Sequence, residues 1–191
     1  FSLPLGLLIC AVRMSKFKPL QWVAKIYISI MRGTPLMLQL IMVFFGPFYI
    51  FGVALPSEYR FYAVIIAFSL NYAAYFAEIY RGGIESISKG QYEAGYVLGM
   101  TKSQMFRKII LKQVIQRIVP PMSNEIITLV KDTALAQILG VIDLLNAANH
   151  AVNNYVVLTP LVYAAIFYLL YNGMITLLFG YLERKMAFYK E

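Results

Sequence analysis

Long apolar stretches separated by short charged ones dominate the pattern of hydrophobic and polar positions. No charged residue occurs within residues 33–57, 61–77 or 159–182. A helix that crosses the hydrocarbon core of a membrane needs about 20 mostly apolar residues. The pattern therefore predicts three membrane-spanning helices, the first of them opened by Thr34 as N-cap and Pro35 as first helical residue.

Two weaker apolar stretches complete the predicted architecture. Phe1–Met14 is too short to cross a membrane alone, so we interpret it as the end of a first span truncated at the N-terminus. Another span follows Lys108 and contains the consecutive prolines Pro120 and Pro121. The expected fold is an all-α membrane protein with about five transmembrane helices, in a single domain over residues 1–191.

The connecting segments are predicted to be less regular. Ser15–Lys25 reads as a basic linker, and Tyr27–Met31 as a short approach helix that ends at Arg32. Residues 134–150 read as a partly apolar helix that leads into a polar region rich in asparagine.

Composition supports a membrane protein and excludes several enzyme classes. Hydrophobic residues make up 60% of the chain and charged residues 14%, against about 45–50% and 25% in soluble domains. One cysteine and one histidine exclude a disulfide framework and argue against a zinc site. The sequence has no phosphate-binding loop for ATP and no G-x-S-x-G before His150 that would suggest a hydrolase.

The net charge of +8 follows membrane topology and does not indicate nucleic-acid binding. All basic residues except Arg60 and Lys131 fall in residues 13–32, in residues 81–117 or in the tail at Glu183–Glu191. Basic residues concentrate on the cytoplasmic side of membrane proteins. The distribution predicts a cell-membrane protein whose start is external, as is the short turn at 56–60 with Glu58. The 13–32 linker, the 81–117 region and the tail are predicted to be cytoplasmic.

The hydrophilic stretch after the third span has its own helix signals. Ser88 with Gln91, and Thr101 with Gln104, have the spacing of capping boxes. Gly99 sits where a helix-ending glycine with positive φ is expected. We predict a short helix over 89–98, a turn, and a new helix from Thr101. Such an amphipathic helix between spans suits docking into a groove of a partner.

This stretch resembles the "EAA" loop of ABC-importer permeases, which covers about residues 84–108 here. The matching order is Glu93-Ala94-Gly95, three residues, Gly99, nine residues, then Ile109-x-Leu111. The resemblance implies that Glu93, Ala94, Gly95 and Gly99 couple the chain to an ATPase.

Two positions depart from the family pattern. Gly95 replaces a second alanine, which predicts a weaker helix because glycine costs about 1 kcal/mol in a helix interior. Lys112 replaces a proline, which lets a helix continue through this position.

Further motifs are similar to the polar amino-acid subgroup of these permeases. They are Arg32-Gly-Thr-Pro35, the run from Ala74 to Ile84, and Lys131-Asp132-Thr133. The resemblance implies a second permease subunit, identical or homologous, a cytoplasmic ATPase dimer that carries ATP and Mg²⁺, and an external solute-binding protein. It implies that this chain is a transport subunit, not an enzyme, and binds no cofactor itself.

Glu125 is the most informative polar residue, because a carboxylate within a span is costly and indicates function. The family pattern, similar to Pro-Pro-x-x-Asn, usually continues with glutamine, whereas this chain has Glu125 after Asn124. A carboxylate there favours a cationic substrate such as arginine, lysine or histidine. Thr128 shares a helix face with Asn124. The alternative for Glu125 is a salt bridge to Lys131 or to an arginine of another span.

Asn71 is the fourth candidate substrate-binding residue, on one helix face with Tyr75 and Glu78. It would line the path or make a hydrogen bond between helices. We expect Glu78 to pair with Arg81 nearby. Lys131 and Asp132 are interpreted as a structural ion pair.

The resulting hypothesis is a permease subunit of an ATP-driven amino-acid importer, embedded in lipid. Two alternatives are an ion-coupled secondary amino-acid transporter and a non-transporting membrane scaffold. Against the first, no inverted repeat is evident and the docking loop would be unexplained. Against the second, polar residues lie inside the spans.

Overall fold

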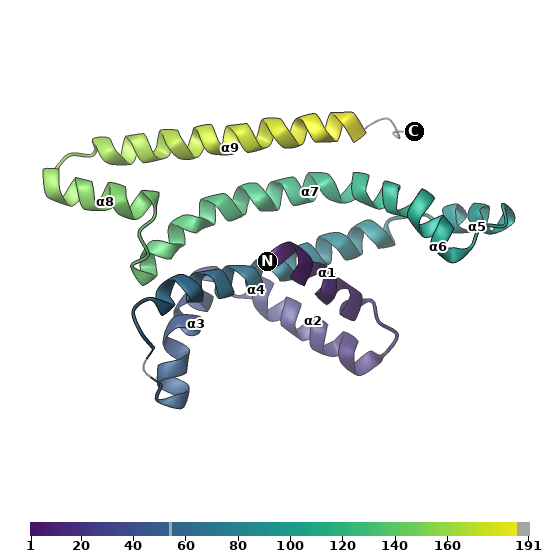
Figure 1. Ribbon diagram of the computed structural model, residues 1–191, viewed down its shortest axis with the longest axis horizontal. Coiled ribbons are helices and arrows are strands. Elements are labelled where there is room, and N and C mark those ends of the chain that lie inside the picture. Colours follow the sequence, from purple (N-terminus) through teal and green to yellow (C-terminus); the bar gives the residue numbers. More distant parts are fainter. Residues whose placement is uncertain (54, 187–191) are drawn as a thin grey trace.

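A computed structural model describes residues 1–53 and 55–186, and every regular element in these ranges is helical (Figure 1). Lys190, counted above with the basic tail, lies outside the described residues. The absence of strands over the described ranges agrees with the predicted all-α class.

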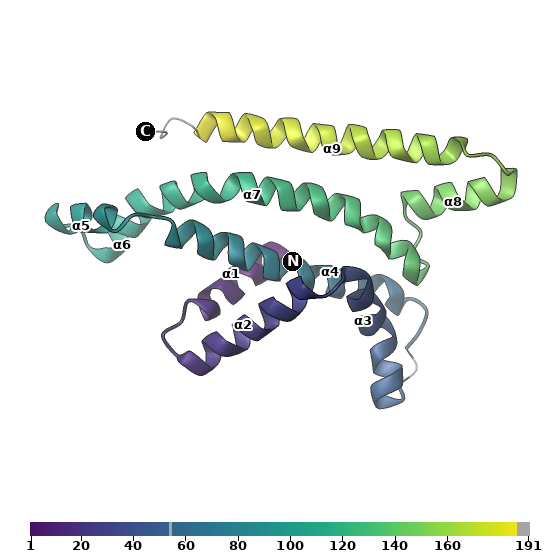
Figure 2. The same cartoon turned by 180° about the vertical axis from the view of Figure 1, so that it is seen from behind.

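Three long helices run side by side and form the body of the molecule. They are α4 (Tyr59–Glu85), α7 (Leu111–Asp132) and α9 (Thr159–Met186), and α7 lies between the other two (Figures 1 and 2). By length and apolar composition, α4 and α9 can each cross a membrane. The prolines Pro120 and Pro121 lie inside α7 without ending it.

Shorter helices cover the other face of α4 and both ends of the body. On that face lie α1 (Ser2–Arg13), α2 (Lys18–Gly33) and α3 (Leu36–Phe51). At one end of the body lie α5 (Lys89–Val97) and α6 (Lys102–Met105), and at the other lies α8 (Leu144–Tyr155) (Figure 1). The π-helical turn η1 (Phe106–Ile110) leads from α6 into α7, and the 3-10 segment η2 (Thr133–Leu139) follows α7.

The centre of the packing is α4, which carries a set of fully buried small residues: Ala63, Ala67, Ala73, Ala74 and Ala77. Gly6 of α1 lies so close to it that a Cβ there would be 2.9 Å from the Phe76 Cβ. Small residues let helix backbones approach closely inside membranes. By contrast, most large side chains of α9 are exposed on this chain, as expected of a surface that meets lipid or another subunit.

The region before the second span differs from the prediction. Residues 18–33 form one helix, α2, and not a linker with a short approach helix. Thr34 does not cap α3, since its hydroxyl donates to the Ile30 carbonyl of α2 at 2.8 Å. Proline disfavours a helical residue before it and lacks an N–H. Pro35 therefore ends α2, and α3 begins after a bend of 109°.

The bent pair of α2 and α3 can be one broken span by length and composition. Arg32 was assigned to a cytoplasmic linker, but the bend places it against Tyr75, well inside α4. The predicted polar region after residue 134 is also more regular than expected. It forms η2 and then α8, which starts at the Asp143 cap, where the Asp143 carboxylate accepts from the Asn146 N–H at 2.7 Å.

Candidate functional site

The predicted docking loop has the expected form. Helix α5 is followed by Gly99 at φ 70°, a conformation that glycine adopts at little cost. Thr101 and Gln104 form the predicted capping box, with reciprocal bonds of 3.0 and 3.3 Å. The Ser88 prediction was wrong, because no side-chain bond caps α5 there. Gln91 instead accepts a hydrogen bond from Gln113 at 2.9 Å, which ties α5 to α7.

The packing of Gly95 explains its departure from the family pattern. A Cβ at this position would lie 2.5 Å from the Met105 sulfur and 2.9 Å from the Met105 Cγ. Met105 is buried in a small apolar cluster with Ile87, Ile110 and Val114. The glycine therefore lets α5 press against the base of the loop, which offsets its low helix propensity.

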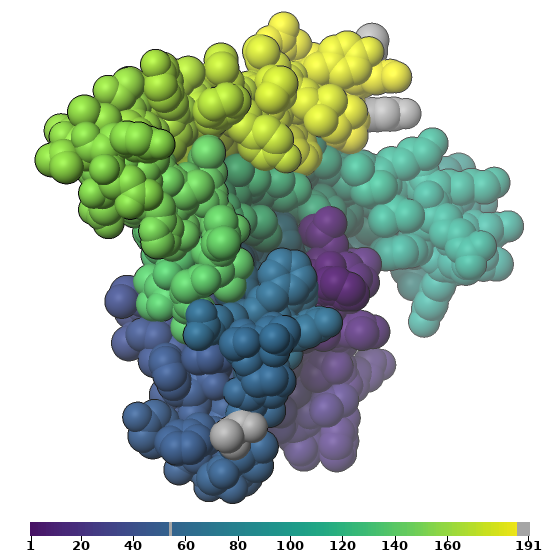
Figure 3. All heavy atoms as spheres, turned by 60° about the vertical axis from the view of Figure 1, so that its left-hand side comes forward, coloured from purple at the N-terminus to yellow at the C-terminus, as the bar shows by residue number. Residues whose placement is uncertain are grey.

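The outer end of α5 presents an apolar surface next to an acidic group. Val97 is 87% exposed and Leu98 74% exposed, and Glu93 and Ala94 are also exposed. This part of the chain projects from the body (Figures 1 and 3). Exposed apolar side chains on a short projecting helix are suited to burial in a groove of another protein.

Ion pairs surround the base of this loop. As predicted, Arg81 pairs with Glu78, at 2.5 Å, and it also pairs with Glu85 at 2.5 Å. Arg13 of α1 reaches Glu78 at 3.9 Å, and Arg117 of α7 donates to the Ser86 carbonyl. These contacts link α1, α4 and α7 where the docking loop leaves the body.

Asn71 of α4 makes hydrogen bonds to both sides of the bend between α2 and α3. Its amide donates to the Met31 carbonyl and to the Gln39 side-chain oxygen, each at 3.0 Å. Gln39 in turn donates to the Met31 and Thr34 carbonyls at 3.0 and 3.2 Å. Asn71 thus makes the hydrogen bonds between helices that the sequence left as one alternative. Its contact with a substrate stays a prediction.

The other three candidate residues lie on α7. Glu125 is half-buried, and Asn124 and Thr128 are exposed on this chain. Thr128 donates to the Asn124 carbonyl at 3.0 Å. In the ranges 1–53 and 55–186, Glu125 has no ion-pair partner. The alternative of a salt bridge within this chain, to Lys131 or to an arginine of another span, was therefore wrong. No hydrogen bond in those ranges joins Asn71 to the three α7 residues.

Asp132 has a different role from the predicted one. Across the described chain it forms no ion pair with Lys131. Instead the Tyr72 hydroxyl of α4 donates to its carboxylate at 2.7 Å. The charge of Asp132 also acts on Glu125. Glu125 and Asp132 are seven residues apart, so one face of α7 carries two carboxylates.

Sequence reasoning also missed Arg32 as part of this region. Its guanidinium lies over the Tyr75 ring, 5.2 Å from the ring centre. The Gly-Thr-Pro sequence after Arg32 is the signal for the helix break.

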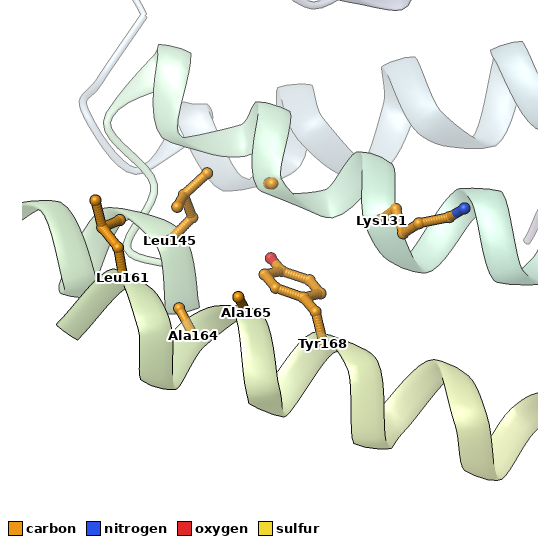
Figure 4. Close-up of a pocket in the computed structure, with 7 residues that line it drawn as sticks. Lys131, Leu145, Leu161, Ala164, Ala165 and Tyr168 are labelled. Atoms are coloured by element: carbon orange, nitrogen blue, oxygen red, sulfur yellow. The ribbon is translucent and has the colours of Figure 1, made fainter. Parts of the chain in front are cut away.

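A cavity of about 320 Å³ lies between α7, α8 and α9. The Tyr168 ring extends from α9 toward α7 with its hydroxyl at the cavity, and the Lys131 ammonium points away from it (Figure 4). Small apolar residues, Ala134, Leu145, Leu161, Ala164 and Ala165, form the rest of the lining. No carboxylate is among the described residues that line this cavity, so its lining differs from the surroundings of Glu125.

Helices that can span a membrane, polar groups at a broken helix and a short projecting helix agree with the architecture of a membrane permease. The model of one family, "Binding-protein-dependent transport system inner membrane component", matches residues 2–188. The chain belongs to this family.

Relatives and a solved structure agree with this assignment. The arginine transport system permease protein ArtQ of Bacillus subtilis (strain 168) is 38% identical over 186 residues, which cover 97% of this chain and 84% of ArtQ. The L-cystine transport system permease protein TcyB of the same organism is 40% identical over 191 residues, covering 99% and 80%. A crystal structure of an amino acid ABC transporter with histidines superposes with a TM-score of 0.86 at 34% identity, covering 96% and 85%.

Proposed function

We propose that this chain forms the translocation path of an ATP-driven importer for a polar amino acid, with a cationic one preferred. The observation that carries the cationic preference is Glu125, half-buried and without an ion-pair partner in the described chain. A carboxylate in a low-dielectric site must be paired, hydrated or neutralised. A cationic side chain can pair with it, and Asp132 adds negative charge nearby. A relative named for arginine transport supports this preference, whereas one named for cystine shows that the family is diverse.

The proposed importer contains partners beyond this chain. The docking loop and the C-terminus face the cytoplasm, where α5 inserts into an ATPase dimer that carries ATP and Mg²⁺. A second permease subunit completes the path, and an external solute-binding protein delivers the substrate. Because this chain only transmits motion, the bundle must have two states whose balance the ATPase changes. The ion pairs at the base of the loop offer a rigid connection for that change.

Within the path, Asn124, Thr128 and Asn71 are proposed to hydrogen-bond the substrate while Glu125 receives its positive charge. Asn124 and Thr128 are exposed on this chain, which suits contact with a ligand or the second subunit. Asn71 would have to exchange a bond at the helix break for one to the substrate.

Uptake into proteoliposomes that contain the complete importer tests this function. We expect uptake of arginine, lysine or histidine in preference to glutamine, only when ATP and the ATPase are present. Uptake that needs an ion gradient but no ATP would show a secondary transporter. No uptake of any amino acid by the complete complex would contradict the transport function itself.

A further inference from the structure

Arg32 occupies an unusual place for a basic residue, at the break between two halves of a broken helix. Its guanidinium lies over the Tyr75 ring of α4, with 5.2 Å to the ring centre. The backbone around it is fixed, since Asn71 and Gln39 both donate to the Met31 carbonyl at 3.0 Å. Arg32 is therefore presented from a rigid position beside α4, not from a flexible loop.

Two carboxylates belong to the helix faces that meet around Tyr72 and Tyr75, whose rings are 6.1 Å apart: Glu78 of α4 and Glu125 of α7. The Tyr72 hydroxyl donates to Asp132 at 2.7 Å, and Glu125 precedes Asp132 by two turns on the same face of α7. Glu78 is already paired with Arg81 and contacts Arg13. Glu125 has no ion-pair partner within residues 1–53 and 55–186. Within the described residues, Arg32 and Glu125 are thus opposite charges, on α2 and α7 around the same part of α4, that do not form an ion pair.

Leaving Arg32 and Glu125 unpaired costs free energy, and the contact between Arg32 and Tyr75 offsets part of that cost. Opposite charges in a medium of low dielectric attract strongly, and an unpaired charge there is unfavourable. The ring of Tyr75 gives the guanidinium a favourable contact, which holds Arg32 against α4. Each charge is left available to a ligand that carries the opposite one.

An amino acid with a cationic side chain carries both complementary charges. Its carboxylate matches a guanidinium, which can bind it through two parallel hydrogen bonds. Its side chain matches Glu125. We propose that Arg32 binds the carboxylate of the substrate and so fixes its orientation between α2 and α7. This inference rests on the proposed function for the role of Glu125, and adds a residue that distinguishes amino acids from simple amines.

The competing interpretation is that Arg32 only stabilises the broken helix or balances the charge of Glu125. Both interpretations predict that replacing Arg32 changes transport. Only the proposed one predicts a change that depends on the carboxylate of the ligand. Arginine and agmatine, which is arginine without its carboxylate, therefore separate the two.

The measurement is direct binding of arginine and agmatine to the permease–ATPase complex in nanodiscs, without the solute-binding protein, whose own specificity would otherwise dominate. We expect Arg32→Gln to weaken arginine binding by about 10- to 100-fold, the range for a hydrogen bond to a charged group. Agmatine binding should stay within about twofold of wild type on the same reasoning. Glu125→Gln should weaken both ligands.

A matched control is Lys25→Gln on the same helix. Lys25 is exposed and lies over Trp22, 5.8 Å from its ring centre, and away from Tyr75. The Lys25→Gln variant should leave the affinities for arginine and agmatine unchanged. Equal weakening of arginine and agmatine by Arg32→Gln, or no weakening of arginine, would overturn the proposal.

Two further variants keep the test decisive if Arg32→Gln does not assemble. Arg32→Lys keeps the charge but loses the planar fork, and Tyr75→Leu removes the ring that holds Arg32. Each should lower the ratio of arginine to agmatine affinity, and an unchanged ratio in both would also overturn the proposal. If wild type binds neither ligand, the cationic preference has failed by itself. The role of Arg32 is then decided by the ratio of the affinity for glutamine to that for glutamine methyl ester, which Arg32→Gln should lower. An unchanged ratio would overturn the proposal.

Discussion

Replacing Gly95 with alanine would restore the residue type of the family pattern, yet we expect it to weaken the docking helix. The new Cβ would lie 2.5 Å from the Met105 sulfur and 2.9 Å from its Cγ. Met105 is only 3% exposed and packs with Ile87 and Val114, so it has little room to move away.

The expected magnitude follows from two opposing effects. Alanine gains about 1 kcal/mol over glycine in a helix interior, whereas overpacking a filled site costs about 1–3 kcal/mol. The net change in the stability of α5 is therefore a loss of up to about 2 kcal/mol. Truncating Met105 to alanine leaves only its Cβ, at an ordinary contact distance of 3.5 Å. In that background Gly95→Ala should stabilise α5 by about 1 kcal/mol.

Hydrogen exchange of the α5 amides measures this local opening free energy. The wild type, the two single variants and the double variant form a cycle, and contacting residues typically couple by about 0.5–3 kcal/mol. We expect Gly95→Ala to speed exchange in the wild-type background and to slow it when Met105 is alanine. Slower exchange in both backgrounds would refute the packing argument.

Two other predictions concern the loop and the topology. Glu93→Lys should reduce copurification of the ATPase and stimulated hydrolysis without loss of membrane insertion. Gly99→Val should do the same, because a branched residue is strained at the φ of 70° found there. Unchanged copurification and hydrolysis in both variants would rule out the docking assignment. Single cysteines at Lys89 and Glu58, in a chain lacking Cys10, should react with an impermeant reagent from opposite sides of the membrane, and labelling from the same side would overturn the topology.

Local signals in the sequence predicted the docking loop well. The capping box of Thr101 and the positive φ of Gly99 depend only on neighbouring residues. The reason for Gly95 was not visible, because its partner Met105 is brought close by the turn between α5 and α6. At Ser88 the capping spacing was present, but Gln91 bonds to Gln113 of α7 instead.

The candidate site was harder to predict because it is made by contacts between distant parts of the chain. Glu125 was identified from its cost inside a span. The bond from Tyr72 to Asp132 joins residues 60 positions apart, and the adjacent Lys131 suggested a local pair instead. Charge counting grouped Arg32 with a cytoplasmic linker, and it gave no sign that the guanidinium packs on Tyr75 of α4.

The preference of the importer for arginine over glutamine in Glu125→Gln tests the central claim most directly. This change keeps the shape of the side chain and removes its charge. The assay is ATP-driven uptake into proteoliposomes. Glu125→Gln should weaken arginine transport by about 1–3 kcal/mol, or roughly 5- to 150-fold, as expected for a hydrogen bond to a charged group. The same variant should spare or improve glutamine transport. Arginine uptake equal to wild type in this variant would contradict both the site and the cationic preference.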